Sequence, residues 1–376
     1  MAATGGRIAR AAGGAGALLG AGLLVFASLG MHRGLLLSDG IRGYFWPWAP
    51  EMGRPALPRA AEALSDPVWQ FVPWIELAKR ELAAGRLPLW NPHQEAGQPL
   101  LGNGISGLSS PLLWPALALP LFPGWNLSLL LRILVSAAGG WALARDHGRS
   151  RAASLLVASV CGLAGPFVAW LEHPQTLTAA AVPWLLLAAG RAARETSPRA
   201  IAAVAGATAL VLAGGHHETA LMAALLAALS LAAEAGRPRA AAGPVAGACL
   251  GAGLSAAFLL PFLEYLPRSA AWAGEDRHLA PLSLGGLVRF IVPRAEGSHP
   301  IEGAAYLSLA VLPLAALGLL AGRRERRTLA LALAAALLLL AAYDGPLSRL
   351  LVEETPVRWS RTPLLLPIPA ALLAAR

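Results

Sequence analysis

Apolar residues in this 376-residue chain form long runs that are separated by short polar connections. Several runs reach the roughly 20 residues that a helix needs to cross about 30 Å of hydrocarbon, and the shorter ones need part of their flanks. The pattern predicts an all-α integral membrane protein, a single polytopic domain (residues 1–376) with about ten transmembrane helices. The runs are Ala11–Met31, Trp125–Ala144, Ala152–Leu171, Leu177–Gly190, Ala200–Gly214, Thr219–Ala233, Ala241–Leu263, Ala304–Ala321, Thr328–Ala342 and Pro363–Ala375.

The composition supports an integral membrane protein, because 56% of residues are hydrophobic, 14% are charged and the mean hydropathy is +0.57. A net charge of +9 would suggest nucleic acid for a soluble protein. Here the arginines occupy alternate connections between apolar runs, which excludes that reading and predicts a cytoplasmic N-terminus. The clusters are Arg7 and Arg10; Arg145, Arg149 and Arg151; Arg191, Arg194 and Arg199; Arg237 and Arg239; and Arg323, Arg324, Arg326 and Arg327.

Two runs need separate treatment. Ala11–Met31 is longer than the apolar core of a secretory signal, about 7–15 residues, and predicts an uncleaved first span. Residues 111–123 are apolar but short and contain four prolines. A full span there would move every later arginine cluster to the outer side, so we interpret this run as a re-entrant or interfacial segment.

This topology gives two large outer loops, residues 32–110 and 264–303. Within the first loop, Asp66-Pro67 is typical of a helix start, and Gly85 of a helix end. The apolar stripe Val68, Phe71, Val72, Ile75 and Leu82 predicts an amphipathic helix over residues 66–84, lying in the membrane interface.

Most of the less common ionisable residues fall on the same, outer side. Charged or titratable groups at membrane depth are costly and tend to be functional. They come from both loops and from two short corners, residues 172–175 and 214–218. These residues are Asp39, Glu95, Glu172, His173, His216, His217, Glu218 and Glu264.

A polar segment, GRLPLWNPHQEAGQPLLGN, stands out within the first loop. Together with Ser38-Asp39 and the proline-rich run that follows, it resembles the amino-terminal region of the YfhO-like bacterial membrane proteins of the GT-C glycosyltransferase superfamily. Further landmarks follow in the same order. They are Leu171-Glu172-His173 with Pro183-Trp184, GGHHE, LLPFLEYLPRS, FIVP, EGAAYLSL, and Arg358 with Arg361.

The resemblance implies a GT-C-like fold and a transferase that moves a sugar from a polyprenyl-phosphate carrier to an acceptor outside a bacterial cytoplasmic membrane. The acceptor would be an envelope polymer, a glycolipid or a protein. Asp39 would be the general base. Whether a divalent metal ion also takes part is left open. Phosphate would be held by outer arginines, and substrate by the landmark residues. These candidates are Arg289, Arg294, Arg358 and Arg361, and Glu172, His173, His216, Glu218 and Glu264.

The chain departs from the family pattern in two respects. His217 stands where the family usually has proline in the GHHE corner. Family members are also commonly much longer, so this chain corresponds to a short member or to an amino-terminal fragment.

Each candidate has a structural alternative. Asp39-Gly40 is also an ordinary turn. The HHE corner is either a metal cluster or, as we favour, polar packing and a helix cap, because adjacent side chains on a helix end point apart. Glu172 and His173 either bind substrate or solvate a helix end, and Trp90-Asn91-Pro92 is interpreted as structural.

A second functional class is a transporter or flippase for a lipid-linked sugar, or a non-catalytic assembly protein. Transporters commonly have internal repeats and polar groups near the midplane of the membrane. This sequence has no evident repeat, and its polar groups gather at the outer ends of the spans. The distribution favours chemistry at the surface.

The topology is testable by cysteine labelling in intact cells, in a chain whose Cys161 and Cys249 have been replaced. A cysteine in place of Arg149 or Arg324 should resist an impermeant thiol reagent, because both positions are expected in the cytoplasm. A cysteine in place of Ala96 should react. The opposite labelling pattern would overturn the orientation.

Overall fold

The computed structural model describes residues 66–376 except 235–237, 270–271, 273–280, 293–303 and 356. The described part is mostly helical, which confirms the predicted all-α class. Two candidate site residues, Asp39 and Arg294, lie outside it, as does the predicted first span.

Three helical stretches are long and apolar enough to cross a membrane. They are α6 (Leu121–Asp146), α7 (Arg151–Leu163) continued by α8 (Gly165–Ala169), and α9 (Pro174–Ala179) continued by α10 (Val182–Arg194). A fourth is the bent pair formed by η3 (Pro238–Ala241) with α13 (Ala242–Leu254) and α14 (Ala256–Tyr265) with η4 (Leu266–Arg268), whose halves meet at 78°. The described residues thus hold three or four candidate spans, and the predicted ten are not established.

Shorter helices complete the described fold. They pack around the candidate spans: α11 lies against α10 and α13, α12 against α10 and α17, and α19 against α7 and α16. These elements are α11 (Pro198–Ala213), α12 (His217–Glu234), η5 (Leu284–Phe290), α16 (Val311–Gly322), α17 (Arg326–Ala342), α18 (Pro346–Glu354), η6 (Trp359–Leu364) and α19 (Pro367–Ala374).

The region of the predicted amphipathic helix contains η2 (Pro67–Phe71) followed by α4 (Val72–Ala83). Of the predicted stripe, Phe71 and Ile75 are buried, whereas Leu82 is exposed. Trp74 is buried on the inner face of α4, and this face packs on α5 (Trp114–Ala118). The Trp74 indole donates a hydrogen bond to Gln94 Oε1 (2.9 Å). Part of the helix face that was predicted to meet lipid therefore contacts protein.

The proline-framed segment forms a small hairpin, with β1 (Trp90–Asn91) antiparallel to β2 (Gln98–Pro99). Its tip passes through positive φ at Glu95, Ala96 and Gly97. A Cβ at Gly97 would lie 2.8 Å from the Trp90 ring, so the turn needs glycine there for both space and backbone angle. The interpretation of Trp90-Asn91-Pro92 as structural stays a prediction, with which this hairpin is compatible.

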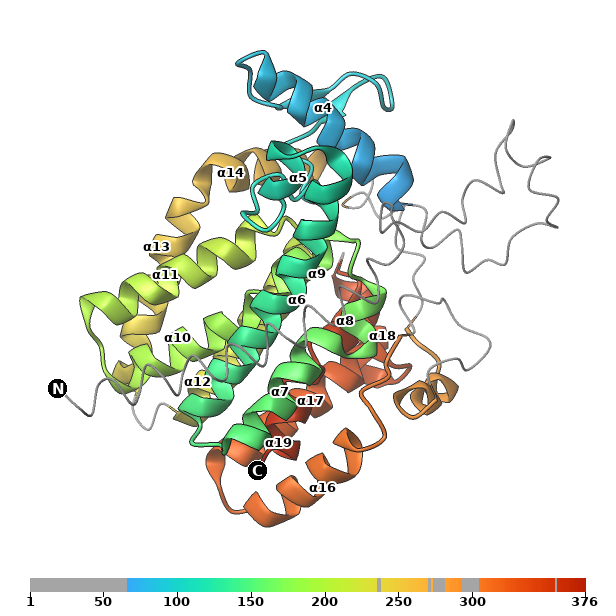
Figure 1. The fold of residues 1–376 in the computed structure, drawn as a ribbon. Coiled ribbons are helices and arrows are strands. Elements are labelled where there is room, and N and C mark those ends of the chain that lie inside the picture. Colours follow the sequence, from blue (N-terminus) through green and yellow to red (C-terminus); the bar gives the residue numbers. More distant parts are fainter. Residues whose placement is uncertain (1–65, 235–237, 270–271, 273–280, 293–303, 356) are drawn as a thin grey trace.

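The predicted re-entrant run, residues 111–123, holds α5 and the first turn of α6. The chain reverses at Pro120, and α5 packs against the start of α6. The contact is close, because a Cβ at Gly124 would lie 2.4 Å from the Pro115 carbonyl oxygen. Figure 1 shows α4 and α5 together at one end of α6, with α7 starting at the other.

Arginine-rich connections gather at that other end. Asp146 at the end of α6 forms ion pairs with Arg191 and Arg194 at the end of α10. Arg376, after α19, pairs with Glu325, which precedes α17. Electrostatic interactions through the turn between α6 and α7 join the two groups. We call this region the arginine end.

The α11–α13 contact depends on glycine at position 251, where a Cβ would lie 2.5 Å from the Ala205 carbonyl oxygen. We expect Gly251→Ala to lower the free energy of unfolding by about 1–3 kcal/mol, as overpacking does. Unfolding in detergent, followed by tryptophan fluorescence, measures this change. Gly253→Ala is the matched control, because no atom lies within 4 Å of a Cβ there. Equal stability of the two variants would contradict the contact.

Candidate functional site

Three segments that are distant in sequence meet at the end opposite the arginine end. Gly214 lies so close to Thr178 of α9 that a Cβ would come within 2.3 Å of Thr178 Oγ1. The His216 backbone N–H donates to the same oxygen (3.3 Å). Gly215, at φ +83°, packs on the backbone of Gly107 in the first loop. The loop, the start of α9 and the α11–α12 corner are thereby held together.

The first loop also reaches α14. A Cβ at Gly102 would lie 3.0 Å from Pro261, and one at Gly104 would lie 2.4 Å from Phe262. The Phe262 ring in turn stacks on His217, with ring centroids 3.6 Å apart. Thus the GHHE corner, the polar loop and the LLPFLEY segment are neighbours in space.

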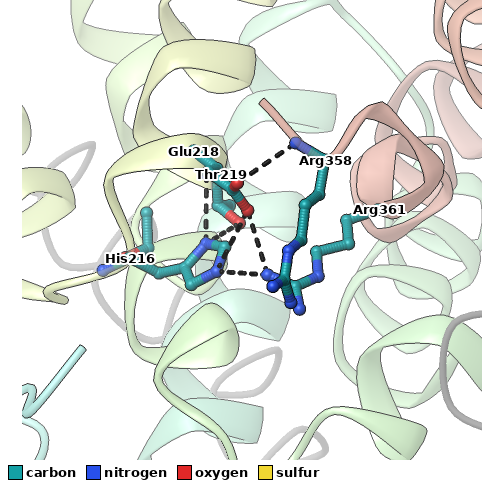
Figure 2. A network of polar contacts seen from close by, with 6 residues as sticks. His216, Glu218, Thr219, Arg358 and Arg361 are labelled. Carbon is teal, nitrogen blue, oxygen red and sulfur yellow. Dashed lines mark hydrogen bonds and ion pairs between the residues drawn. The ribbon is translucent and has the colours of Figure 1, made fainter. Parts of the chain in front are cut away.

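A polar network occupies this region and joins the α11–α12 corner to η6. Arg361 Nη1 donates to Glu218 Oε2 (2.9 Å) and contacts His216 Nε2 (3.2 Å). The other carboxylate oxygen, Oε1, accepts from the Arg358 backbone N–H (3.1 Å). Figure 2 shows the side chains of Arg358 and Arg361 extending toward each other beside Glu218. Glu218 therefore fixes both the guanidinium of Arg361 and the backbone of Arg358.

His216 is 3% exposed and is neutral in this setting. Burial, followed by the positive charge of Arg361, holds the pKa of His216 well below its usual value. His216 Nδ1 accepts from the Thr219 backbone N–H (3.2 Å) and lies 2.8 Å from Thr219 Oγ1, while Nε2 faces the Arg361 guanidinium. The imidazole thus bridges the first turn of α12 and Arg361.

His173 is 2% exposed and lies between two aromatic rings. Its centroid is 5.6 Å from that of Phe71 and 5.1 Å from that of Trp170, both edge-on, and its Nε2 is 4.0 Å from Asp66 Oδ2. The Arg361 guanidinium lies 5.2 Å from the same Trp170 ring. Trp170 therefore connects His173 with the polar network.

Arg132, within α6, is a functional candidate that our sequence analysis missed. It is 1% exposed, and its Nη1 donates to the carbonyl oxygens of Leu171 (2.6 Å) and His173 (3.0 Å). Glu172 lies near enough to interact with it electrostatically. A single arginine inside the apolar run Trp125–Ala144 was the available signal, since intramembrane charge marks either function or structural pairing.

Two other candidates lie elsewhere in the described structure. Glu264 is exposed and forms an ion pair with Arg268 one helical turn later (3.0 Å). Arg289 is buried in η5, whose last residue, Phe290, lies beside Tyr343 at the end of α17. The network itself brings together His216, Glu218, Arg358 and Arg361, with His173 linked through Trp170.

No group of three or more histidine, cysteine, aspartate or glutamate side chains is arranged to hold a metal ion among the described residues. Between His216 and Glu218, the position that a cation would take is filled by the Arg361 guanidinium. Metal binding that involves Asp39 stays a hypothesis.

Comparison with known protein families, with curated proteins and with solved structures finds no match to this chain.

The buried, neutral state of His216 predicts a pH dependence of stability. The unfolded chain binds a proton near pH 6.5 and the folded chain resists it, so the contribution is fully present above that pH and is lost as the pH falls. We expect unfolding in detergent to become easier from pH 7 to pH 5 by up to about 1.4 kcal/mol per pH unit from this group. His216→Asn, which keeps a short polar side chain beside Thr219, should reduce that slope. Identical slopes would contradict a neutral His216.

Proposed function

We propose that this chain is a membrane glycosyltransferase of the GT-C type. It transfers a sugar from a polyprenyl-phosphate carrier to an envelope polymer, glycolipid or protein on the extracytoplasmic side of a bacterial cytoplasmic membrane. One observation carries the proposal: four of the family landmarks converge at the end opposite the arginine end. They are the GHHE corner, the corner at residues 172–175, the polar loop, and Arg358 with Arg361. In the proposed topology of about ten spans, the arginine end is cytoplasmic.

The proposed chemistry requires a cationic place for the phosphate that leaves. Arg361 donates to Glu218 through its guanidinium, and Arg358 donates to the same carboxylate through its backbone N–H. Both side chains extend beside Glu218 (Figure 2), and both guanidinium groups are the proposed contacts for phosphate. Glu172, His173, His216 and Glu264 remain proposed substrate-side residues.

Asp39 is the proposed general base. It accepts the proton of the acceptor hydroxyl while that oxygen bonds to the anomeric carbon, and the bond from this carbon to the carrier phosphate breaks. The phosphate leaves with its charge stabilised by arginine. A divalent metal ion would add to this stabilisation, and removal of metal by a chelator tests whether transfer depends on it.

The second candidate is a transporter for the same lipid-linked sugar. The observation in its favour is the 78° bend between α13 and α14. Broken helices at a binding site are frequent in transporters. The polar network at one end, rather than midway along the helices, favours transfer.

The deciding experiment assays detergent-solubilised protein, with the carrier and acceptor in the same micelles, and detects the product by mass analysis. A transferase forms product there, whereas a flippase does not, because no bilayer separates the two sides. We expect Arg358→Ala to lower the rate of sugar transfer at a given carrier concentration about 10- to 100-fold, because one charge-assisted hydrogen bond to phosphate is lost. Arg358→Lys should lose less, since the charge remains.

The controls keep the fold and change other groups. Arg349→Ala removes an exposed arginine whose described partner is Asp344, and it should leave transfer unchanged. Asp39→Asn should reduce transfer by about 10²–10⁴, with Glu95→Gln as its control in the same loop. Full transfer by the Asp39→Asn variant would show that Asp39 is not the general base. Absence of product with the wild-type protein would favour the transporter.

A further inference from the structure

A groove of about 780 Å³ runs between α10 and α11. From α10 it is lined by Trp184, Leu187 and Ala188, residues three or four apart and hence on one face of the helix. From α11 it is lined by small and apolar residues with the same spacing, including Gly206 and Leu210. The groove is therefore an apolar channel bounded by two neighbouring helices.

The groove exists because α11 uses its other face for packing. Val204 and Thr208 of α11 meet Gly247 and Gly251 of α13, where the backbones approach closely. The groove face is left uncovered by the described chain: Leu210 is 39% exposed, and no atom lies within 4 Å of a Cβ built at Gly206. Exposure of this apolar face to water would be unfavourable, so we expect an apolar partner to cover it.

Cations mark one end of the groove. Its lining ends at Arg191, Arg194 and Arg199, beside the N-terminus of α11, where Ser197 caps the helix by accepting from the Ala200 N–H (3.2 Å). Arg191 and Arg194 are held in place by Asp146. Glu195 also lines this end. Three arginines and a helix N-terminus against these two carboxylates leave a net positive site suited to a phosphate group.

The length of the groove fits one lipid chain. Arg199 and Leu210 are eleven residues apart, which is roughly 16 Å along the helix. One leaflet of a bilayer contributes about 15 Å, half of the hydrocarbon thickness. An apolar channel one leaflet deep, with cations at the arginine end, matches the distribution of polarity in a phospholipid.

We propose that the α10–α11 groove binds one anionic phospholipid, with an acyl chain along Leu187, Gly206 and Leu210 and its phosphate at Arg199 and the start of α11. This site is at the arginine end and is separate from the polar network around Glu218. The proposal does not depend on the proposed transferase activity. It identifies the chemical class that occupies the groove, an anionic lipid.

The test measures lipid bound to the purified full chain by native mass spectrometry, after titration with phosphatidylglycerol or phosphatidylcholine. We expect one preferentially retained phosphatidylglycerol. Gly206→Leu adds a side chain whose Cβ has open space in the groove, and it should weaken retention about tenfold, because several methylene contacts of the lipid are displaced. Gly253→Leu is the matched control, with equally open space on α13, outside the groove lining.

A second pair of variants tests the cations. Arg199→Gln should weaken retention about fivefold, and Arg151→Gln, an exposed arginine of the same end outside the groove lining, should not. Equal retention of the two lipids, equal effects of Gly206→Leu and Gly253→Leu, or equal effects of the two arginine variants would overturn the proposal. Displacement of the lipid by inorganic phosphate alone would overturn the role of the acyl chain.

Discussion

The described fold depends on a charge buried within the longest helix. The helical structure is interrupted between α8 and α9, and such a break leaves carbonyl oxygens at the helix end without partners inside the helix. In an apolar surrounding those oxygens need a donor from elsewhere. Arg132 supplies it, bonding to the carbonyls of Leu171 and His173 and to Thr176 Oγ1 (3.2 Å). The break can then be kept at a fixed position beside α6.

That fixed break supports the polar network. It places Trp170, whose ring meets both His173 and the Arg361 guanidinium. The α11–α12 corner docks on the same region through Thr178, which accepts from the His216 N–H. Glu218 then ties the corner to η6. A chain of partly buried hydrogen bonds and aromatic contacts thus runs from α6 to η6, and loss of a hydrogen-bonded member leaves its partner unsatisfied.

The two ends of the helices differ in chemistry. The arginine end carries ion pairs with one solvent-exposed member, such as Arg191 in its pair with Asp146, and solvent screening weakens such pairs. The opposite end carries a network that is largely shielded from solvent, where each interaction is stronger and costlier to break. An anionic lipid at the first end and substrate chemistry at the second are compatible because they use separate surfaces.

Sequence alone was sufficient for the helical class, because apolar runs of this length leave few alternatives. It also predicted a helix within residues 66–84, where the structure has η2 and α4. The packing of α4 on α5 was not evident from the sequence, and it buries Phe71 and Ile75 of the predicted stripe but not Leu82.

Only the tertiary structure decided which polar residues are neighbours. Glu218 and Arg361 are 143 positions apart, and no periodicity relates them. Glu264 has the same residue type as Glu218 yet pairs locally with Arg268, because it lies on an exposed helix turn. Helix patterns are encoded by nearest neighbours along the chain, whereas contacts between helix ends depend on how whole helices pack, and that information is spread over the entire sequence.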